Sequence, residues 1–369
     1  MVSGPARARY IFLVPWPLRP GTGVNAVVLG LATAMRDRYE PVFVVTGWDA
    51  PPPGQIWVKL PSPAGGLRSN LGFVARLVPN LLLLRKIVRE AVAVNPHFIC
   101  LELLPLVLLR RLRLCPKLVL SVHGADVAEA LTTSGWRRAM FEWMLSSADL
   151  VVACSHALAA QVRRVSTRAR IAAVWNAVGA DADFAPTRPL DARYVLSVAH
   201  FVPKKAHDVL LRAFKIVERE RPNLRLALIG GDGPGRQTVI SLIESLALRS
   251  KVDVMVDVPH PETLRWICHA ECLILPSRDE PFGIVLLEAA MARTPVVATR
   301  VGGIPEFLRD KIHGLLCDPD RPEEIARAVL TTLSDRAGTE ARVRAFQDHA
   351  KAFTWERAFA RYRAKANLV

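Results

Sequence analysis

The sequence lacks any apolar run long enough to cross a membrane and has little that is typical of a secreted protein. A transmembrane helix needs about 18 or more apolar residues, whereas the nearest candidate, Phe98–Leu109, is short and contains Glu102. Arg7 and Arg9 precede an apolar run, as in a signal peptide, but prolines interrupt that run and no small-residue cleavage site follows. We therefore expect this segment to form the first strand of a folded domain.

Regularly spaced cysteines are also lacking, because the 6 cysteines are scattered along the chain. A disulfide framework is not expected, which favours a reducing compartment and hence a cytoplasmic protein. Acidic residues are scarce beside basic ones, 34 against 49, and the net charge is +15. Residues 1–185 contribute +10 of this charge and residues 186–369 contribute +5.

This excess of basic residues fits an anionic partner: a phosphate-rich substrate, an anionic lipid surface or nucleic acid. A frequent use of arginine without any binding role is the alternative interpretation. The sequence contains no RNA-binding signature and no zinc-finger spacing. Charge alone supports nucleic acid, and we expect no nucleic-acid partner.

Strand-like apolar runs alternate with helical patterns, which predicts an α/β protein with parallel sheets covered by helices. A stretch rich in Ala, Asp and Pro at 179–189 reads as a linker, after which the alternation restarts. We predict domains at 1–185 and 186–350, and a C-terminal helix at 351–369 that packs with either of them. The expected strands are 10–14, 41–46, 98–101, 117–121, 150–154, 194–199, 224–229, 252–256, 272–275 and 295–299, and expected helices include 80–94 and 136–147.

The strongest functional signal is the segment Ser277–Glu288, which follows a predicted buried strand and opens a helix. Ligands bind at the carboxyl ends of strands in open α/β sheets, where Glu280 would lie. Gly283 permits a close approach of the backbone, and the free amides of the first helical turn, including Ile284, suit a phosphate. Glu288 lies among apolar residues and needs a partner, such as the hydroxyls of a ligand.

Structural roles are open alternatives for both glutamates: a buried salt bridge for Glu288 and a favourable helix N-terminal charge for Glu280. Two further glycine turns follow predicted strands of the same half, one with Gly231 and Gly233, the other with Gly302 and Gly303. Glycine turns at three strand ends of one sheet indicate phosphate binding more specifically than any one turn does.

With these motifs the chain resembles the retaining family-4 glycosyltransferases of the GT-B fold, in which two Rossmann-like parallel-sheet domains face a central cleft. The family hallmark is a pair of glutamates eight residues apart with Phe-Gly between them, matched here by Glu280, Phe282-Gly283 and Glu288. Weaker matches extend into the first half and to the C-terminus. The matching segments are 295–299, 301–306, 313–316, 147–155, 174–176 and 353–356.

The resemblance implies a hexosyltransferase that uses a nucleotide-diphosphate sugar such as a UDP- or GDP-sugar. Catalytic roles would fall to Glu280, at the donor sugar's hydroxyls, and to His123, near the same sugar. Glu288 would bind the ribose, and the amides of Gly283 and Ile284 would meet the diphosphate. The remaining donor-binding residues would be Lys205 and His200, with glycine turns at Gly21, Gly23, Gly231 and Gly233.

The acceptor stays open between a glycan, a lipid-linked molecule and a small molecule. A lipid-linked acceptor and the basic first half together suggest contact with an anionic membrane surface, on the cytoplasmic face of the inner membrane. The resemblance implies no cofactor and no essential metal. The Gly21-x-Gly23 pattern imitates a dinucleotide fingerprint, but prolines separate it from the strand, and Cys268, His269 and Cys272 are expected in the core.

Three positions depart from the family pattern: His200 replaces an arginine, and Ala206 and Arg293 replace glycines. Arginine gives a permanent, forked phosphate contact that histidine does not. His200 and Arg293 keep open the alternative of a non-catalytic partner protein that kept the fold. A nucleotide-sugar epimerase of the same fold is a second alternative.

Overall fold

The computed structural model describes residues 7–16, 18, 23–45, 56–59, 69–100, 103–179 and 187–368. Contacts divide the chain into two units, each considered separately below. Unit 1 consists of Met1–Asn176 and Trp355–Val369, and unit 2 consists of Ala177–Thr354. These divisions differ from the predicted domain boundaries after 185 and 350, and 180–186 of the predicted linker lie outside the described residues.

Unit 1 contains a parallel sheet of seven strands in the order β3-β2-β1-β4-β5-β6-β7. β1 is a continuous apolar run because both faces of the sheet are covered; its residues Tyr10, Ile11 and Phe12 are all buried. The strand order reverses between β1 and β4. The strands are β1 (Ala8–Val14), β2 (Tyr39–Val45), β3 (Ile56–Lys59), β4 (Ala91–Pro96), β5 (Lys117–Val122), β6 (Leu150–Ala153) and β7 (Ile171–Ala173).

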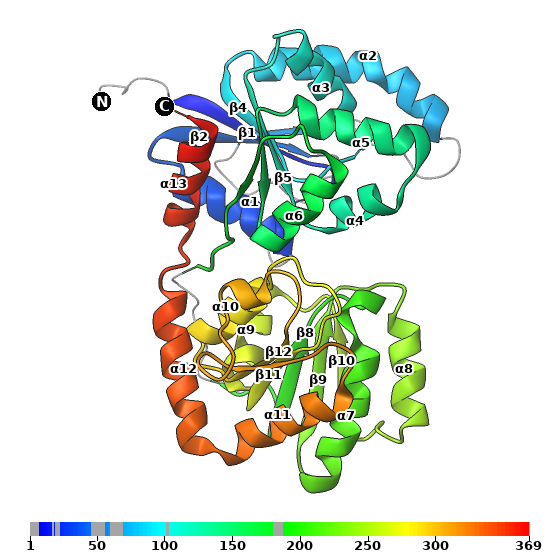
Figure 1. The fold of residues 1–369 in the computed structure, drawn as a ribbon, viewed down its shortest axis with the longest axis vertical. Coiled ribbons are helices and arrows are strands. Elements are labelled where there is room, and N and C mark those ends of the chain that lie inside the picture. The colour runs from blue at the N-terminus through cyan, green and yellow to red at the C-terminus, as the bar shows by residue number, and fades with distance from the viewer. Residues whose placement is uncertain are drawn as a thin grey trace. The chain divides into compact units, whose positions relative to one another are not determined.

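Helices cover both faces of this sheet (Figure 1). The C-terminal helix α13 (Trp355–Ala366) packs with α1 (Gly23–Ala34) on one face, where the ring of Trp355 lies directly over Gly30. The C-terminal helix therefore belongs with unit 1. The other face carries α2 (Ser69–Val88), α3 (Leu104–Arg111), α4 (Ala125–Thr132), α5 (Gly135–Ser147) and α6 (His156–Val165).

Unit 2 contains a parallel sheet of six strands in the order β10-β9-β8-β11-β12-β13. The order reverses between β8 and β11. The strands are β8 (Tyr194–Val198), β9 (Arg225–Gly230), β10 (Val252–Val256), β11 (Cys272–Leu275), β12 (Val296–Thr299) and β13 (Leu315–Cys317). Two short 3-10 helices, η2 (Pro203–Lys205) and η3 (Ile304–Glu306), follow β8 and β12.

The helices of unit 2 also form two layers. In α7 the buried residues Val209, Ala213, Phe214 and Val217 recur at helical spacing, so one face of the helix packs on the sheet and on α11. The first layer is α7 (His207–Glu220), α8 (Arg236–Ser245) and α11 (Pro322–Ser334); the second is α9 (His260–His269), α10 (Ile284–Met291) and α12 (Arg336–Ala350) (Figure 1).

Two sequence predictions of secondary structure were wrong, a strand and the end of a helix. The expected strand at 98–101 does not exist in the described part of that range, and the expected helix at 80–94 ends at Val88. The strand is Ala91–Pro96, which pairs with β1 and β5, and Pro96 ends it. Short alternating Ala and Val residues fit a helix equally well, and only the pairing on both sides selects the strand.

Among the described residues, no helix is both long and apolar enough to span a membrane.

Candidate functional site

The carboxyl ends of β8 and β11 are neighbours at the point where the strand order of unit 2 reverses. Open α/β sheets bind ligands at such a point. The segment after β8 carries Lys205 and the loop after β11 carries Glu280, and Lys205 Nζ donates to Glu280 Oε2 at 2.6 Å. Both side chains are mostly buried, with exposed fractions of 14% and 9%. These two predicted site residues form one charge-assisted contact.

The turn after β12 holds the backbone of Glu280. The N–H of Gly303 donates to the Glu280 carbonyl at 3.0 Å. Gly302 has a φ of +52°, and a Cβ atom at that position would lie 2.0 Å from the same carbonyl oxygen. Only glycine combines this backbone conformation with so close an approach. The glycine turn at 302–303 therefore fixes the loop that presents Glu280.

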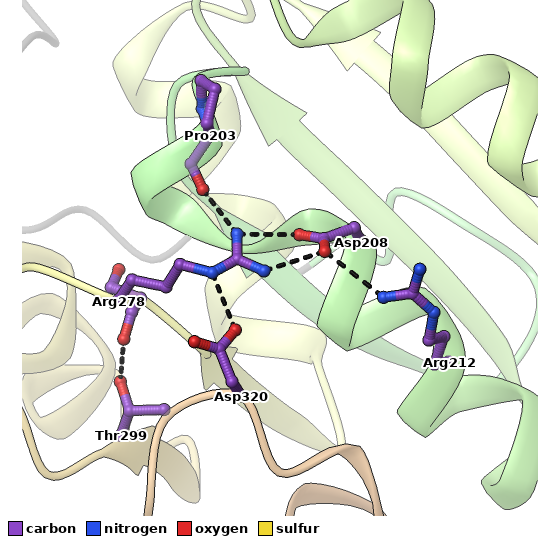
Figure 2. Close-up of polar contacts among 7 residues, drawn as sticks. Pro203, Asp208, Arg212, Arg278, Thr299 and Asp320 are labelled. Atoms are coloured by element: carbon purple, nitrogen blue, oxygen red, sulfur yellow. Dashed lines mark hydrogen bonds and ion pairs between the residues drawn. The ribbon is translucent and has the colours of Figure 1, made fainter.

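A second anchor is Arg278, which lies in the same loop (Figure 2). Its Nη1 and Nη2 atoms donate to the two oxygens of Asp208, at 3.0 and 2.8 Å, and its Nε donates to Asp320 at 2.7 Å. The hydrogen bond with Asp208 is the largest cause that raises the pKa of Arg278. The guanidinium thus joins the β11 loop to the first turn of α7 and to the β13–α11 loop.

The same arginine also holds the 3-10 turn that contains Lys205. Arg278 Nη1 donates to the carbonyl of Pro203 at 2.8 Å, and the backbone N–H of Arg278 donates to the carbonyl of Lys204 at 2.8 Å. These contacts keep Lys205 beside Glu280. Arg278 lies within the Ser277–Glu288 segment, but no role was predicted for it from the sequence.

The amino end of α10 is arranged as the motif suggested. Gly283 precedes the helix with a φ of +95°, and no side chain caps the first turn that begins at Ile284. Uncapped amides at a helix start, together with the helix dipole, favour an anion. An anion bound to these amides would therefore lie next to the loop that carries Glu280.

Glu288 lies in α10 beyond its first turn, and it has a partner that was not predicted from the sequence. Its Oε1 lies 2.8 Å from Nε2 of His260, the first residue of α9. The hydrogen bond to Glu288 is the largest cause that raises the pKa of His260, ahead of the opposing effect of burial. This pair satisfies the expectation that a carboxylate in an apolar helix needs a partner.

The glycine turn after β9 lies against the segment that follows β8. A Cβ atom on Gly231 would lie 2.3 Å from Nδ1 of His200, and one on Gly233 would lie 2.5 Å from the carbonyl oxygen of Phe201. His200 is exposed on its other side. Desolvation of the ring is the largest cause that lowers the pKa of His200, followed by the positive charge of Lys205. A neutral His200 lies close to the Lys205 segment.

Two of the three departures from the family pattern adopt the backbone that glycine favours. Ala206 has a φ of +53° and Arg293 has a φ of +62°. Such a conformation costs an L-residue with a side chain roughly 1–2 kcal/mol. The chain therefore keeps the backbone of a glycine-containing pattern at both positions without the glycine. Ala206 is buried in the core of unit 2, whereas Arg293 is exposed.

In unit 1, His123 follows β5 and its Nε2 lies 3.1 Å from Nδ1 of His97, which follows β4. The two rings are stacked, with centroids 5.3 Å apart. Asp126 accepts hydrogen bonds from the N–H groups of His123, Gly124, Val127 and Ile99. His97 and Asp126 were not predicted, and His97 is fully buried.

Of the other predicted residues, Gly23 is the first residue of α1, and Gly21 lies outside the described residues. In the described part of the chain no group of three or more His, Cys, Asp or Glu side chains could hold a metal ion. Cys272 is fully buried in β11, and burial raises the pKa of Cys268 on α9. Cys272 is therefore a core residue, as expected, whereas Cys268 is half-buried.

Comparisons with known proteins identify the family of the chain. The family model described as "Glycosyl transferases group 1" matches residues 180–351, and the model described as "Glycosyltransferase Family 4" matches residues 21–182. D-inositol 3-phosphate glycosyltransferase of Thermobispora bispora is 35% identical over 181 residues, which are 47% of this chain and 42% of that protein. The chain thus matches less than half the length of this relative. An uncharacterized glycosyltransferase of Methanocaldococcus jannaschii is 26% identical over 65% of both chains.

Solved structures show the fold. The structure of Anabaena HepE in complex with UDP and glucose has a TM-score of 0.80 at 18% identity, covering 98% of this chain and 100% of that one. Sucrose-phosphate synthase from Thermosynechococcus elongatus has a TM-score of 0.79 at 20% identity, covering 96% and 98%. The fold is therefore GT-B, as the sequence predicted. Since the two family models together run from residue 21 to residue 351, the chain belongs to glycosyltransferase family 4.

Proposed function

We propose that the protein transfers a hexose from a nucleotide-diphosphate sugar to an acceptor, with retention of the anomeric configuration. The observation that carries this proposal is the Lys205–Glu280 pair, 2.6 Å apart, at the reversal point of the unit 2 sheet. Glu280 lies in the loop that leads to the uncapped first turn of α10. A cation, free amides and a hydrogen-bonding carboxylate are the groups that a diphosphate bonded to a sugar needs.

The residues then divide into two sets. Lys205 and the amides of Gly283 and Ile284 bind the diphosphate, with His200 beside them. Because the leaving diphosphate gains charge as the glycosidic bond breaks, preorganised donors lower the barrier, and this role needs no metal. Gly21, Gly23, Gly231 and Gly233 stay in the proposed donor-binding set, because a backbone without side chains lets a phosphate approach closely.

The second set recognises the two rings of the donor. Glu280 accepts hydrogen bonds from hydroxyls of the sugar, and the family resemblance assigns His123 to a sugar hydroxyl as well. Glu288 accepts from the ribose hydroxyls, and the contact with His260 orients its carboxylate. The complex of Anabaena HepE with UDP and glucose supports a uridine diphosphate donor; a GDP-sugar is the second choice.

A donor panel tests this proposal. Purified protein is incubated with UDP-, GDP- and ADP-sugars, with and without glycan, lipid-linked and small-molecule acceptors, and nucleotide release is measured. We expect release with one donor, and a product whose anomeric configuration by NMR matches that of the donor. Glu280→Gln should abolish most of the release, whereas Arg300→Gln, an exposed arginine after β12, should not. Inversion at the anomeric carbon would contradict retention.

Two other outcomes identify the alternatives. An epimerase would convert the donor sugar without any acceptor. A non-catalytic protein would release no nucleotide with any donor, even where a nucleotide raises its melting temperature. Each of these results would replace the proposed transfer reaction.

We further propose that unit 1 contacts an anionic membrane surface, where a lipid-linked acceptor would be found. Large apolar side chains are exposed on the helix layer that contains α2, α3 and α5. Arginines accompany them, including Arg111 within α3 and Arg113 after it. Apolar and tryptophan side chains beside basic ones fit a membrane interface. The exposed apolar residues are Val78, Leu82, Leu112, Leu114 and Trp136.

Vesicle sedimentation tests the membrane contact. Binding to vesicles with anionic lipid should fall as salt rises, because each basic residue near such a surface contributes about 1 kcal/mol that salt screens. Trp136→Ser should weaken binding, whereas Ile312→Ser, an exposed apolar residue of unit 2, should not. No binding at low salt would refute this part.

All 6 cysteines are free thiols, which supports a reducing location such as the cytoplasm.

A further inference from the structure

The ring of His123 has one engaged nitrogen and one open nitrogen. Its Nε2 faces Nδ1 of His97 at 3.1 Å. No group in the described part of the chain hydrogen-bonds to its Nδ1, and the side chain is partly exposed. The chemistry that His123 offers a ligand therefore depends on which nitrogen carries the proton.

The direction of the hydrogen bonds begins at a backbone carbonyl. Asn95 Nδ2 lies 2.6 Å from the carbonyl oxygen of Val119 and 2.9 Å from Oγ of Ser121. A carbonyl can only accept, so the amide nitrogen of Asn95 must lie on this side. The amide oxygen then faces Nε2 of His97 at 3.2 Å and accepts from the hydroxyl of Tyr10 at 3.2 Å.

This orientation fixes the proton of His97. An amide oxygen only accepts, so Nε2 of His97 must carry a proton, since otherwise two lone pairs would face each other. Burial, and next the neighbouring His123, lower the pKa of His97 well below its usual value, so the ring is neutral and has a single proton. Nδ1 of His97 is then an acceptor, and Nε2 of His123 must donate to it.

We propose that His97 is a positioning residue that holds His123 in the Nε2–H tautomer, so that Nδ1 of His123 presents a lone pair to a ligand hydroxyl. This inference rests on the proposed function only for the ligand. His123 accordingly selects a sugar that has a hydroxyl at the contacted carbon, and it disfavours a ligand that offers only an acceptor there, such as fluorine or a carboxylate. Orienting groups of this kind decide which ring nitrogen of a histidine is available.

The tautomer is measured directly by long-range ¹H–¹⁵N correlation of the histidine rings in the full-length protein, with His123 assigned by loss of its signals in His123→Asn. We expect a protonated Nε2 with a slowly exchanging proton and a bare Nδ1. His97→Leu and Asn95→Leu should each speed the exchange of the Nε2 proton of His123 with solvent and give a mixture of the two tautomers. Ser121→Ala, which leaves the Asn95–Val119 contact, should keep the wild-type pattern. A proton on Nδ1, or a pattern that is unchanged in His97→Leu, overturns the proposal.

The ligand is tested with UDP-glucose as the probe. Binding should shift the Nδ1 resonance of His123 in the direction of an accepted hydrogen bond, and His97→Leu should lower kcat/KM roughly tenfold, as for the loss of one hydrogen bond. Among deoxy and fluoro derivatives, both substitutions at the contacted carbon should be poor, and the fluoro derivative should be at least as poor as the deoxy one. If UDP-glucose shifts other resonances and leaves His123 unchanged, this inference fails while the donor site stands. If it shifts no resonance, the proposed UDP-sugar donor fails, and the tautomer result still decides the role of His97.

Discussion

Replacing Lys205 with alanine should destabilise unit 2 by more than the difference in helix propensity between the two residues. The change removes the ammonium that lies 2.6 Å from Glu280 Oε2. The only other side-chain donor to that oxygen among the described residues is Ser277 Oγ at 3.4 Å. A carboxylate with an exposed fraction of 9% is then left without a cation.

The magnitude depends on whether the pair behaves as a surface or a buried ion pair. Exposed pairs contribute about 0.2–1 kcal/mol, whereas removal of one partner from a buried pair costs about 3–5 kcal/mol. The exposed fractions of 14% and 9% place this pair near the buried case. We therefore expect Lys205→Ala to lower the free energy of unfolding of unit 2 by about 3 kcal/mol. Glu280→Gln in the same chain removes the unpaired charge and should recover roughly half or more of that loss.

The assay must report on unit 2 alone, since two units can unfold separately. Trp266 is the only tryptophan in 177–354, so the ¹⁹F signal of a fluorotryptophan at that position follows unit 2 through a urea titration. Lys204→Ala is the matched control, and its effect should stay within about 0.5 kcal/mol. The reasoning is refuted if Lys205→Ala is as stable as Lys204→Ala, or if adding Glu280→Gln lowers stability further.

Three more predictions follow from unit 2. Glu288→Gln should destabilise the protein most at about pH 5.5, and the difference in stability from the wild type should shrink by about pH 8.5. The reason is that Glu288 raises the pKa of His260, and the stability gained from this shift is lost as the pH rises through that pKa. A difference in urea midpoint that grows with pH would contradict this. Arg293→Gly should add roughly 0.5–1 kcal/mol by relieving the left-handed backbone at an exposed site, and Arg293→Ala, the control in thermal melts, should not. Gly302→Ala should cost at least about 2 kcal/mol in urea denaturation, whereas Gly179→Ala, with nothing within 4 Å, should be near neutral; equal effects would show that the turn yields.

Much of the fold could be predicted because buried parallel strands appear in the sequence as continuous apolar runs. β5, β8 and β11 all lie at the predicted positions. Apart from β4, the strands that were not predicted are short: β3 has 4 residues, and β7 and β13 have 3 each. Their place in the sheet depends on pairing with a neighbour far along the chain, which local periodicity does not contain.

The predicted site divides in the same way. Glu280, Gly283 and Glu288 lie in one segment, so their spacing along a strand, loop and helix was visible in the sequence. His260 lies 28 residues before Glu288, in a segment with no motif, and only the arrangement of α9 beside α10 brings them together. A raised pKa caused by one partner is a property of the folded structure, and the sequence contained no signal for it.

Arg278 shows why a motif can be identified and still be incompletely understood. It lies two residues before Glu280, yet its side-chain contacts are with Asp208, 70 residues away, and Asp320, 42 residues away. Figure 2 shows these contacts and the hydrogen bond that Arg278 donates to the carbonyl of Pro203. That hydrogen bond holds the turn of Lys205 against the loop of Glu280. The ion pair of the proposed donor site therefore depends on a third residue that needs no contact with the ligand. A motif identifies the groups that meet a ligand, but the distances between them are set by contacts such as these, which join segments far apart in the sequence.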